Sequence, residues 1–450
     1  MKKSLILTLF AALALTSSSY SQSFTTIYAF ADASGGSSVN GTPYIDAGGV
    51  LYFTAGEGGT GAACLDGCGT VVSVIPAVPP STSWTESTIY TFQGTPDGAY
   101  PESGLIQGPG GTLIGTTYEG GATVNAQSCP AGCGVAFQLT PPADPGGAWT
   151  DQTLLNYPAA NYNPLGLVMG PNGVLYGAAT YGGRQQCQGD DGIGCGLIYE
   201  VQPPSLAGGS WTSGPIYKFS GGLRGEFPNS PLVLSANGAL YGTFVSGGAG
   251  SNGGVFSLAP TQVSGDKWSA SLLYSFETAI RGAAPEAGMV AGPNGVLYGS
   301  TASGGPGCGT KGCFGTVFSM TPPAQAGESW KKTGLYAFKG GVSDGSLPQS
   351  FGTNPAVNTD GSIYGVTTRG GGTGCGGEGC GILFKLSPPD EVGGAWTETI
   401  LHIFTGGADG QNPQFAPAID PNGVLYGVAG GGAGTACFGI GCGVVYQYVP

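Results

Sequence analysis

Short apolar segments separated by polar turns recur along the chain. Near Pro285, the segments APEAGMVAG, VLYGSTASGG, GTVFSMTPP and SWKKTGLYAF each have the length and composition of a β-strand. The first two are joined by Asn294-Gly295, a strong hairpin signal because both residues accept positive φ. A Pro pair ends the third segment, since proline cannot donate a hydrogen bond to a strand ladder. No segment shows helical periodicity, so the pattern predicts an all-β protein.

This group of four segments occurs seven times, with a spacing of about 62 residues. The second strands of the copies are centred on Leu51, Leu113, Leu175, Leu240, Leu297, Ile363 and Leu425. Four antiparallel strands in each of seven copies predict a seven-bladed β-propeller over residues 22–450. An open β-solenoid is the alternative, but a solenoid would not need the two ends of the chain to complement each other.

The two ends do supply complementary strands. Residues 24–30, FTTIYAF, resemble a fourth strand, and residues 441–450 form a third strand with no fourth strand after it. We therefore expect residues 24–30 to pair with residues 443–448 and close the ring, which leaves neither edge open.

Six fourth strands each carry two aromatic residues eight positions apart. The pairs are Trp84 and Phe92, Trp149 and Tyr157, Trp211 and Phe219, Trp268 and Phe276, Trp330 and Phe338, and Trp396 and Phe404. Because side chains alternate along a strand, an even separation predicts that both rings lie on one face. The identical spacing favours core packing over ligand contacts.

The N-terminus has the features of a secretory signal peptide. Lys2 and Lys3 precede a short apolar run at 4–15, and Ser19-Tyr20-Ser21 offers small residues for cleavage before Gln22. Residues 1–21 are therefore predicted to be removed and the remainder to be secreted, to the exterior, the cell surface or the periplasm. A membrane anchor is disfavoured because the run is short.

Charge excludes some partners. Without residues 1–21 the chain carries 11 basic and 26 acidic side chains, a net charge of about −15. No basic stripe is present, so we expect neither nucleic acid nor an anionic membrane surface as a partner.

Twelve cysteines form six local pairs, each between the second and third strands of one copy. The pairs are Cys64/Cys68, Cys129/Cys133, Cys187/Cys195, Cys308/Cys313, Cys375/Cys380 and Cys437/Cys442, and the fourth copy has none. In an exported chain this pattern predicts disulfides that fix the shape of long loops. A zinc site would need two pairs to converge or histidines to help, and the chain has one His, so we expect no metal.

The order of these motifs resembles a known family. NGVLYGST, a Gly pair, a cysteine pair, a strand ending in Pro-Pro, a Trp, a Phe and an Asp-Gly turn follow one another in the copies. This order resembles the GloVer tandem repeat of exported bacterial proteins, over essentially the whole chain after residue 21. The resemblance implies an extracellular or surface-associated repeat protein and carries no catalytic assignment. Anchoring by a C-terminal tail is not expected, because the chain ends within a predicted strand.

Candidate chemistry lies where the long loops depart from the repeat. In a propeller the loops between second and third strands share a face with the loops between blades, here called the long-loop face, and loops on a rigid scaffold carry function. Charged or aromatic side chains vary there between copies. The candidate binding residues are Glu57, Tyr118, Glu119, Tyr181, Arg184, Arg224, Arg281 and Arg369. Solvated loop tips are the alternative reading of the same residues.

Two further residue types are interpreted as structural. The Asp-Gly pairs in the loops between blades favour turn formation over calcium binding. His402 takes the place of Tyr28, Tyr90 and Tyr274 in a fourth strand, so we expect it in the core. With no other His in the chain, we do not expect Ser-His-Asp or Cys-His catalysis.

These observations predict a secreted monomeric propeller without a cofactor that binds a saccharide or a protein on its long-loop face. The alternative is a polysaccharide hydrolase, with Glu57 and Glu119 as paired carboxylates, or a lyase that uses Tyr and Arg. A third interpretation is a scaffold whose regular shape is its function.

Overall fold

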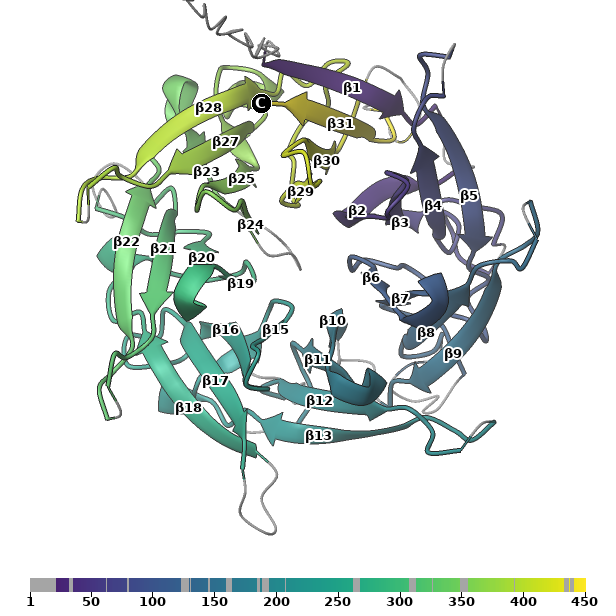
Figure 1. Cartoon of the computed structure of the whole chain (residues 1–450), viewed down its shortest axis with the longest axis horizontal. Coiled ribbons are helices and arrows are strands. Elements are labelled where there is room, and N and C mark those ends of the chain that lie inside the picture. The colour runs from purple at the N-terminus through teal and green to yellow at the C-terminus, as the bar shows by residue number, and fades with distance from the viewer. Residues whose placement is uncertain are drawn as a thin grey trace, which may run out of the picture.

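Seven antiparallel sheets, here called blades, stand around a central axis (Figure 1). The structure is a computed structural model. It describes residues 22–31, 35–61, 63–78, 81–122, 129, 131–144, 146–158, 164–183, 187, 194–206, 208–261, 268–306, 313–325, 327–348, 355–391, 393–432, 437 and 441–450. The predicted signal peptide lies outside the described residues. No helix in the described part of the chain is both long enough and apolar enough to span a membrane.

The strands of each blade are ordered from the axis outwards. Blades 1 to 3 contain β2 (Ser37–Ile45), β3 (Leu51–Glu57), β4 (Thr70–Ile75) and β5 (Thr85–Thr91); β6 (Ile106–Gln107), β7 (Leu113–Thr116), β8 (Val135–Thr140) and β9 (Thr150–Asn156); and β10 (Pro164–Met169), β11 (Leu175–Ala179), β12 (Leu197–Gln202) and β13 (Thr212–Lys218). Blades 4 and 5 contain β14 (Glu226–Pro228), β15 (Val233–Leu234), β16 (Leu240–Ser246), β17 (Gly254–Pro260) and β18 (Trp268–Ser275); and β19 (Val290–Ala291), β20 (Leu297–Thr301), β21 (Thr316–Thr321) and β22 (Lys331–Ala337). Blades 6 and 7 contain β24 (Ala356–Val357), β25 (Ile363–Thr367), β27 (Ile382–Ser387) and β28 (Thr397–Ile403); and β29 (Ala418–Ile419), β30 (Leu425–Ala429), β31 (Val444–Val449) and β1 (Ser23–Ala29).

Short elements occupy turns within and between the blades. β23 (Gly345–Ser346) and β26 (Arg369–Gly370) form an extra pair, and the single-turn 3-10 helices are η1 (Pro109–Gly111), η2 (Pro171–Gly173), η3 (Gly222–Arg224), η4 (Ala279–Arg281), η5 (Pro293–Gly295), η6 (Gly341–Ser343) and η7 (Cys375–Gly377). The Asn-Gly hairpins have the predicted backbone. Asn172 in η2 has φ 58° and Asn294 in η5 has φ 57°, each followed by a Gly with positive φ.

The predicted closure of the ring is confirmed. β1 pairs with β31 from Ser23 opposite Val449 to Ala29 opposite Val444. The Phe30 amide then donates to the Gly443 carbonyl at 3.0 Å. The first strand of the chain thus completes the last blade, as Figure 1 shows.

The aromatic pairs pack in the core, but the prediction that both rings share one face is wrong. A β-bulge interrupts each fourth strand: Val71 lies opposite Tyr90 and Val72 opposite Thr88, so Ile89 is an extra residue. One extra residue reverses the alternation of side chains. Trp84 therefore packs on Tyr426 of the preceding blade, with ring centroids 5.9 Å apart.

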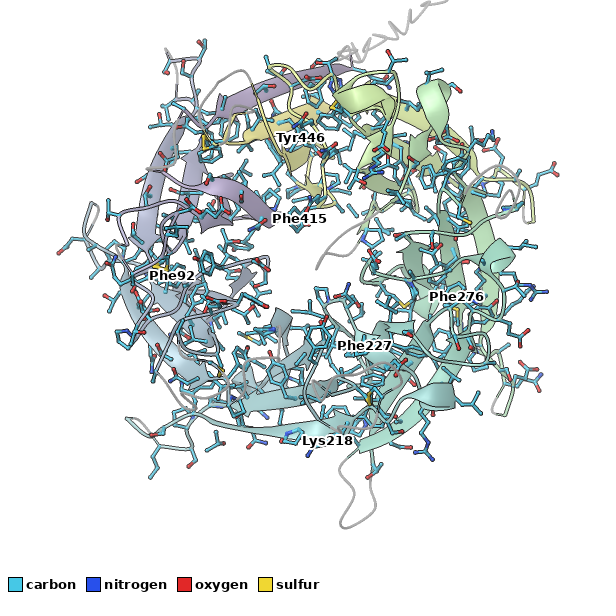
Figure 2. The ribbon with its side chains drawn as sticks, turned by 180° about the vertical axis from the view of Figure 1, so that it is seen from behind. Phe92, Lys218, Phe227, Phe276, Phe415 and Tyr446 are labelled. Atoms are coloured by element: carbon cyan, nitrogen blue, oxygen red, sulfur yellow. A yellow bond between two sulfur atoms is a disulfide. The ribbon has the colours of Figure 1, made fainter. Side chains whose placement is uncertain are left out.

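The second ring of each pair reaches the following blade instead. Phe92 contacts Phe137 at 5.0 Å, Phe276 contacts Phe318 at 5.4 Å, and Phe404 contacts Tyr446 at 5.5 Å. Figure 2 shows Phe92, Phe276 and Tyr446 out among the blades, whereas Phe415 lies beside the central opening. Each fourth strand thus joins its blade to both neighbours.

The disulfides form as predicted in the described part of the chain. Their bonds are Cys64–Cys68, Cys129–Cys133, Cys187–Cys195, Cys375–Cys380 and Cys437–Cys442. Cys313 is also disulfide-bonded, and its predicted partner Cys308 lies outside the described residues.

The second cysteine of a pair also links its blade to the next. The Cys68, Cys195 and Cys380 carbonyls accept the amides of Tyr100, Phe227 and Asn412 at 2.9, 2.9 and 2.8 Å. In the fourth copy, which has no cysteine, the Asn252 carbonyl accepts the Ala284 amide at 3.1 Å. The loop shape therefore matters at the boundary between blades, and a cysteine pair is one of two ways to hold it.

We expect Phe92→Ala to lower the free energy of unfolding by about 3–5 kcal/mol, because a fully buried ring between two blades is replaced by a cavity. Chemical denaturation followed by tryptophan fluorescence measures the change. Trp84→Ala is the matched control and should cost less, because the Trp84 ring is only partly buried. Equal costs would contradict the assignment of the two rings to different environments.

Candidate binding site on the long-loop face

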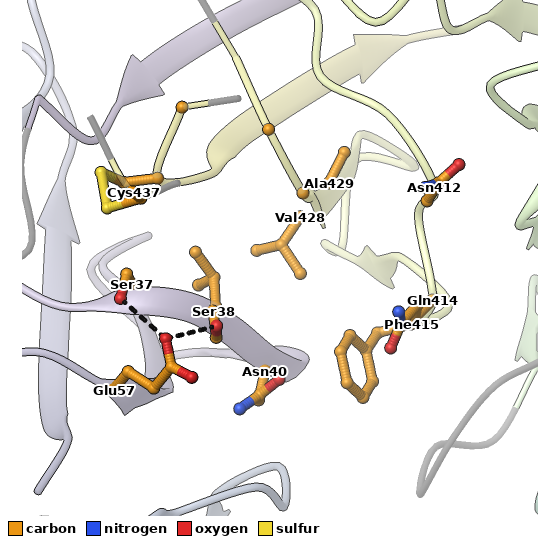
Figure 3. Close-up of a pocket in the computed structure, with 15 residues that line it drawn as sticks. Ser37, Ser38, Asn40, Glu57, Asn412, Gln414, Phe415, Val428, Ala429 and Cys437 are labelled. Carbon is orange, nitrogen blue, oxygen red and sulfur yellow. Dashed lines mark hydrogen bonds between the residues drawn. A yellow bond between two sulfur atoms is a disulfide. The ribbon is translucent and has the colours of Figure 1, made fainter. Parts of the chain in front are cut away.

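A pocket of about 290 Å³ lies between blade 1 and blade 7, where the ring closes. One wall comes from β2 and β3, and the other from the segment that leads into β29 (Figure 3). The Cys437–Cys442 disulfide borders the pocket, so it opens toward the loops between second and third strands. The pocket therefore lies on the face that sequence analysis selected.

Glu57 supplies the pocket with its carboxylate. It ends β3, and it accepts hydrogen bonds from the Ser37 hydroxyl at 3.4 Å and the Ser38 hydroxyl at 3.2 Å. Figure 3 shows the three side chains together on one wall. No ion pair between described residues includes Glu57. The carboxylate thus keeps acceptor capacity for a ligand.

Amides and one aromatic ring complete the lining. Asn40 stands on the Glu57 side, while Asn412, Gln414 and Phe415 stand opposite (Figure 3). Phe415 is only 6% exposed and belongs to the apolar cluster of blades 1 and 7, so its position is fixed by packing. The pocket combines hydroxyl, amide and carboxylate groups with an apolar wall.

Asn40 and Gln414 were not among the predicted site residues, and a repeated backbone feature of the structure marks their positions. Each is the second residue after a non-glycine residue with positive φ at the start of a blade. These left-handed residues are Ser38, Tyr100, Phe227, Ala284, Leu347 and Asn412, with φ between 47° and 58°. The described residues at the position of Asn40 and Gln414 in other blades include Glu102, Asn229 and Glu286. Five blades therefore present an amide or carboxyl group at the same place.

Three other predicted residues, Tyr118, Glu119 and Tyr181, lie beside this pocket in blades 2 and 3. Glu102 reaches solvent, yet desolvation by surrounding protein raises its pKa, and the charges of Glu119 and Glu57 raise that pKa further. Burial and the charges of Glu102 and Glu119 also raise the pKa of Tyr118. The structure thus brings Glu57, Glu119 and Tyr118 into one electrostatic neighbourhood with Glu102, which sequence analysis did not select.

Tyr181 lies at the edge of this group. Its ring contacts Phe227 of blade 4 edge-on, with centroids 5.7 Å apart. It also influences the titration of Tyr118, so the two tyrosines are near each other.

The predicted arginines lie elsewhere. Arg369 pairs with Glu378 at 2.8 Å, with both side chains about half exposed. Arg224 lines a different pocket, on the outer strands of blades 3 and 4, and the Arg281 carbonyl accepts a hydrogen bond from Lys332 at 2.8 Å. Arg184 lies outside the described residues. The described arginines are thus not part of the pocket that contains Glu57.

His402 occupies the position of Tyr90 and Tyr336 in an outer strand, and its side chain is 20% exposed, so it is partly buried rather than in the core as expected. Its ring stacks on Phe24 at 3.5 Å, and its Nε2 is hydrogen-bonded to Asp409 at 2.9 Å. Burial lowers the pKa of His402, although Asp409 opposes this effect. The same bond joins Tyr90 to Asp97 at 2.7 Å and Tyr336 to Asp344 at 3.0 Å. The Asp of each Asp-Gly turn therefore anchors a ring of the fourth strand.

Two carboxyl groups with strongly raised pKa values lie at blade boundaries rather than in the pocket. Burial, with the charge of Asp344, raises the pKa of Glu398 to about 7, and its carboxyl contacts the Tyr336 hydroxyl at 3.0 Å. Burial, with the charge of Asp97, raises the pKa of Asp151 to about 7. These groups belong to the packing of blade against blade.

The geometry defines a class: a seven-bladed propeller, tied by disulfides within its blades, with a polar pocket where the ring closes. The chain belongs to the Gloeobacter/Verrucomicrobia repeat family, whose model matches residues 123–378. No curated protein sequence matches it.

Similar solved structures share little sequence with the chain. The PQQ-bound aldose sugar dehydrogenase of Streptomyces coelicolor is 12% identical, with a TM-score of 0.41 and coverage of 95% of this chain and 99% of that one. A gluconolactonase of Xanthomonas campestris is 13% identical, with a TM-score of 0.38 and coverage of 75% and 82%. An extracellular domain of a one-component system of B. thetaiotaomicron is 12% identical, with a TM-score of 0.47 and coverage of 95% and 41%.

We expect Glu398→Gln to flatten the dependence of the melting temperature on pH. The pKa of Glu398 is about 7 in the folded state against an ordinary 4.5, so the folded state holds the proton more tightly. The stability from this group is complete below pH 4.5 and is lost as the pH rises through 7. Thermal melts between pH 4 and 8 measure the slope. Glu378→Gln, at the surface pair with Arg369, is the control, and an unchanged slope in Glu398→Gln would contradict the raised pKa.

Proposed function

We propose that the protein is a secreted binding module that holds a neutral saccharide in the pocket between blades 1 and 7. The observation that carries this proposal is the pocket lining: Glu57, Ser38, Asn40 and Gln414 around the buried Phe415. Such groups form hydrogen bonds with hydroxyls, and an apolar wall packs on a sugar ring. A volume of about 290 Å³ suits a short part of a chain, with the rest on the open face.

The distribution of charge supports a ligand without negative charge. Residues 22–183 carry ten Asp and Glu, residues 386–450 carry five, and neither segment contains Lys or Arg. These segments build blades 1, 2 and 7 and part of blades 3 and 6. An anionic polysaccharide would meet like charge around the pocket without a counter-ion. Proteins are an alternative class of ligand, and acidic proteins would be disfavoured for the same reason.

Secretion is part of the proposal. Disulfides form and persist in oxidising compartments, and five of them occur between described cysteines. They agree with the signal peptide predicted at residues 1–21. Detection of the mature chain, starting at Gln22, outside the cytoplasm of the producing cell tests this part.

A hydrolase is the second candidate function, because one observation favours it. The raised pKa of Glu102, between the charges of Glu119 and Glu57, fits a general acid beside a carboxylate partner. The groups lie on adjacent blades, as the paired-carboxylate hypothesis requires. In this case the same face would bind the polysaccharide and cleave it.

A panel of neutral, basic and acidic polysaccharides distinguishes these functions. We expect the oxidised mature chain to retain a neutral polysaccharide, and Glu57→Gln to weaken retention roughly tenfold, because a hydrogen bond to a charged group is lost. Glu378→Gln is the matched control, because the Glu378 carboxylate pairs with Arg369 and does not line the pocket. Retention of acidic polysaccharides alone would contradict the proposal.

Product analysis tests the hydrolase directly. New reducing ends that appear with the native chain and disappear with Glu102→Gln would establish cleavage. Retention without new ends, in both proteins, would leave the binding function alone.

A further inference from the structure

One position recurs at the boundaries between blades. The residues that occupy it indicate which chemical group would fit a second pocket. In each outer strand, one residue lies four positions before the position that is occupied by Tyr28, Tyr90, Leu155, Tyr217, Tyr274, Tyr336 or His402; we call it the slot residue. The slot residues are Phe24, Glu86, Asp151, Ser213, Ala270, Lys332 and Glu398. The preceding blade presents aromatic rings to this position.

The rings have one arrangement at several boundaries. Between blades 4 and 5, Tyr274 and Phe276 are 5.1 Å apart and Phe276 and Phe318 are 5.4 Å apart, all measured between ring centroids. Between blades 3 and 4, Tyr217 and Phe219 are 5.0 Å apart, and Phe219 and Phe256 are 5.2 Å apart. The two boundaries thus provide matching aromatic surfaces.

The slot residues differ in what they place on these rings. Lys332 lays its side chain over all three rings of its boundary, with its Nζ 5.5–6.0 Å from their centroids, and donates to the Arg281 carbonyl at 2.8 Å. Glu398 contacts Tyr336 at the next boundary, and Phe24 stacks on His402 at the one after that. Ala270 has only a methyl group, although it holds the same register, opposite Leu258, that Lys332 holds opposite Met320.

The missing side chain leaves a pocket. A volume of about 260 Å³ lies over Tyr217, Phe219 and Phe256, with Ala270 in its wall and Arg224 beside it. Leu223 and Leu272 border this volume and are 72% and 49% exposed.

At three boundaries the loop beside the slot carries a residue with the same sign of charge as the slot residue, whereas the loop with Asp409 stands beside the uncharged Phe24. Loops with Asp97 or Asp344 stand beside the carboxyl slot residues Asp151 and Glu398. The loop with Arg281-Gly282 stands beside Lys332, whose ammonium group uses the Arg281 backbone carbonyl. The loop beside the pocket has the same Arg-Gly pair. Arg224 ends η3 and is followed by Gly225, just as Arg281 ends η4 and is followed by Gly282.

We propose that the pocket between blades 3 and 4 binds a primary alkylammonium group, supplied by a lysine side chain of a partner protein. The aliphatic stem lies on Tyr217, Phe219 and Phe256, and the ammonium group donates to the Arg224 carbonyl, as Lys332 does one blade further on. The exposed Leu223 and Leu272 give the partner an apolar contact around the lysine. This site is independent of the saccharide pocket.

The first test compares two small peptides that differ only in the ammonium group. Gly-Lys-Gly and Gly-norleucine-Gly, both with blocked ends, are titrated into the oxidised chain by ligand-observed NMR. We expect the lysine peptide to bind at least about tenfold more tightly than the norleucine peptide, and more tightly than n-butylamine. Equal binding of both peptides would overturn the proposal, and n-butylamine binding as tightly as the lysine peptide would overturn the assignment to a protein partner.

Three variants locate the site. Ala270→Lys should occupy the pocket with its own side chain and abolish binding of the lysine peptide, and Ala270→Met should do so by filling the volume without charge. Lys332→Ala should open a matching pocket between blades 4 and 5 and lower the melting temperature. Addition of n-butylamine should then restore part of the lost melting temperature. Unchanged peptide binding in both Ala270 variants, or absence of rescue in folded Lys332→Ala, would contradict the proposal.

Discussion

The structure depends on the packing of each outer strand against two blades at once. The bulge in that strand turns its first aromatic ring toward the preceding blade and its last ring toward the following one, as Trp84 and Phe92 show. No blade can bury its own apolar face alone, so each boundary stabilises two blades, as in other repeat architectures. The ring is then complete only when β1 supplies the outer strand of blade 7.

The loops follow from this arrangement. In blades 2, 4, 5, 6 and 7 the left-handed residue at the start of the blade donates a hydrogen bond to the loop of the blade before it, and the disulfides hold such loops in shape. The residue two positions later then faces the pocket in blades 1 and 7, as Asn40 and Gln414 do. The polar pocket is therefore a product of the scaffold rather than an addition to it.

Periodicity in the sequence was enough to predict the propeller, the closure and the disulfide pairs, because each depends on local patterns that recur. The faces of Trp84 and Phe92 were predicted wrongly, since alternation of side chains assumes a regular strand and a bulge leaves no mark in the spacing. Glu57 was selected as a departure from the repeat. Asn40, Gln414 and Phe415 were missed because the pocket joins the two ends of the chain, and Ala270 because a cavity is defined by a side chain that is absent.

Hydrogen exchange of the closing strand tests the central claim that all seven blades are held by equivalent boundaries. The protection of β1 amides is compared with that of β31 and of β13, the outer strand of blade 3, under conditions that report unfolding. We expect β1 to be protected as strongly as β13 and to open in the same event as β31. Fast exchange of β1 while β31 stays protected would show that the ring does not depend on its closure.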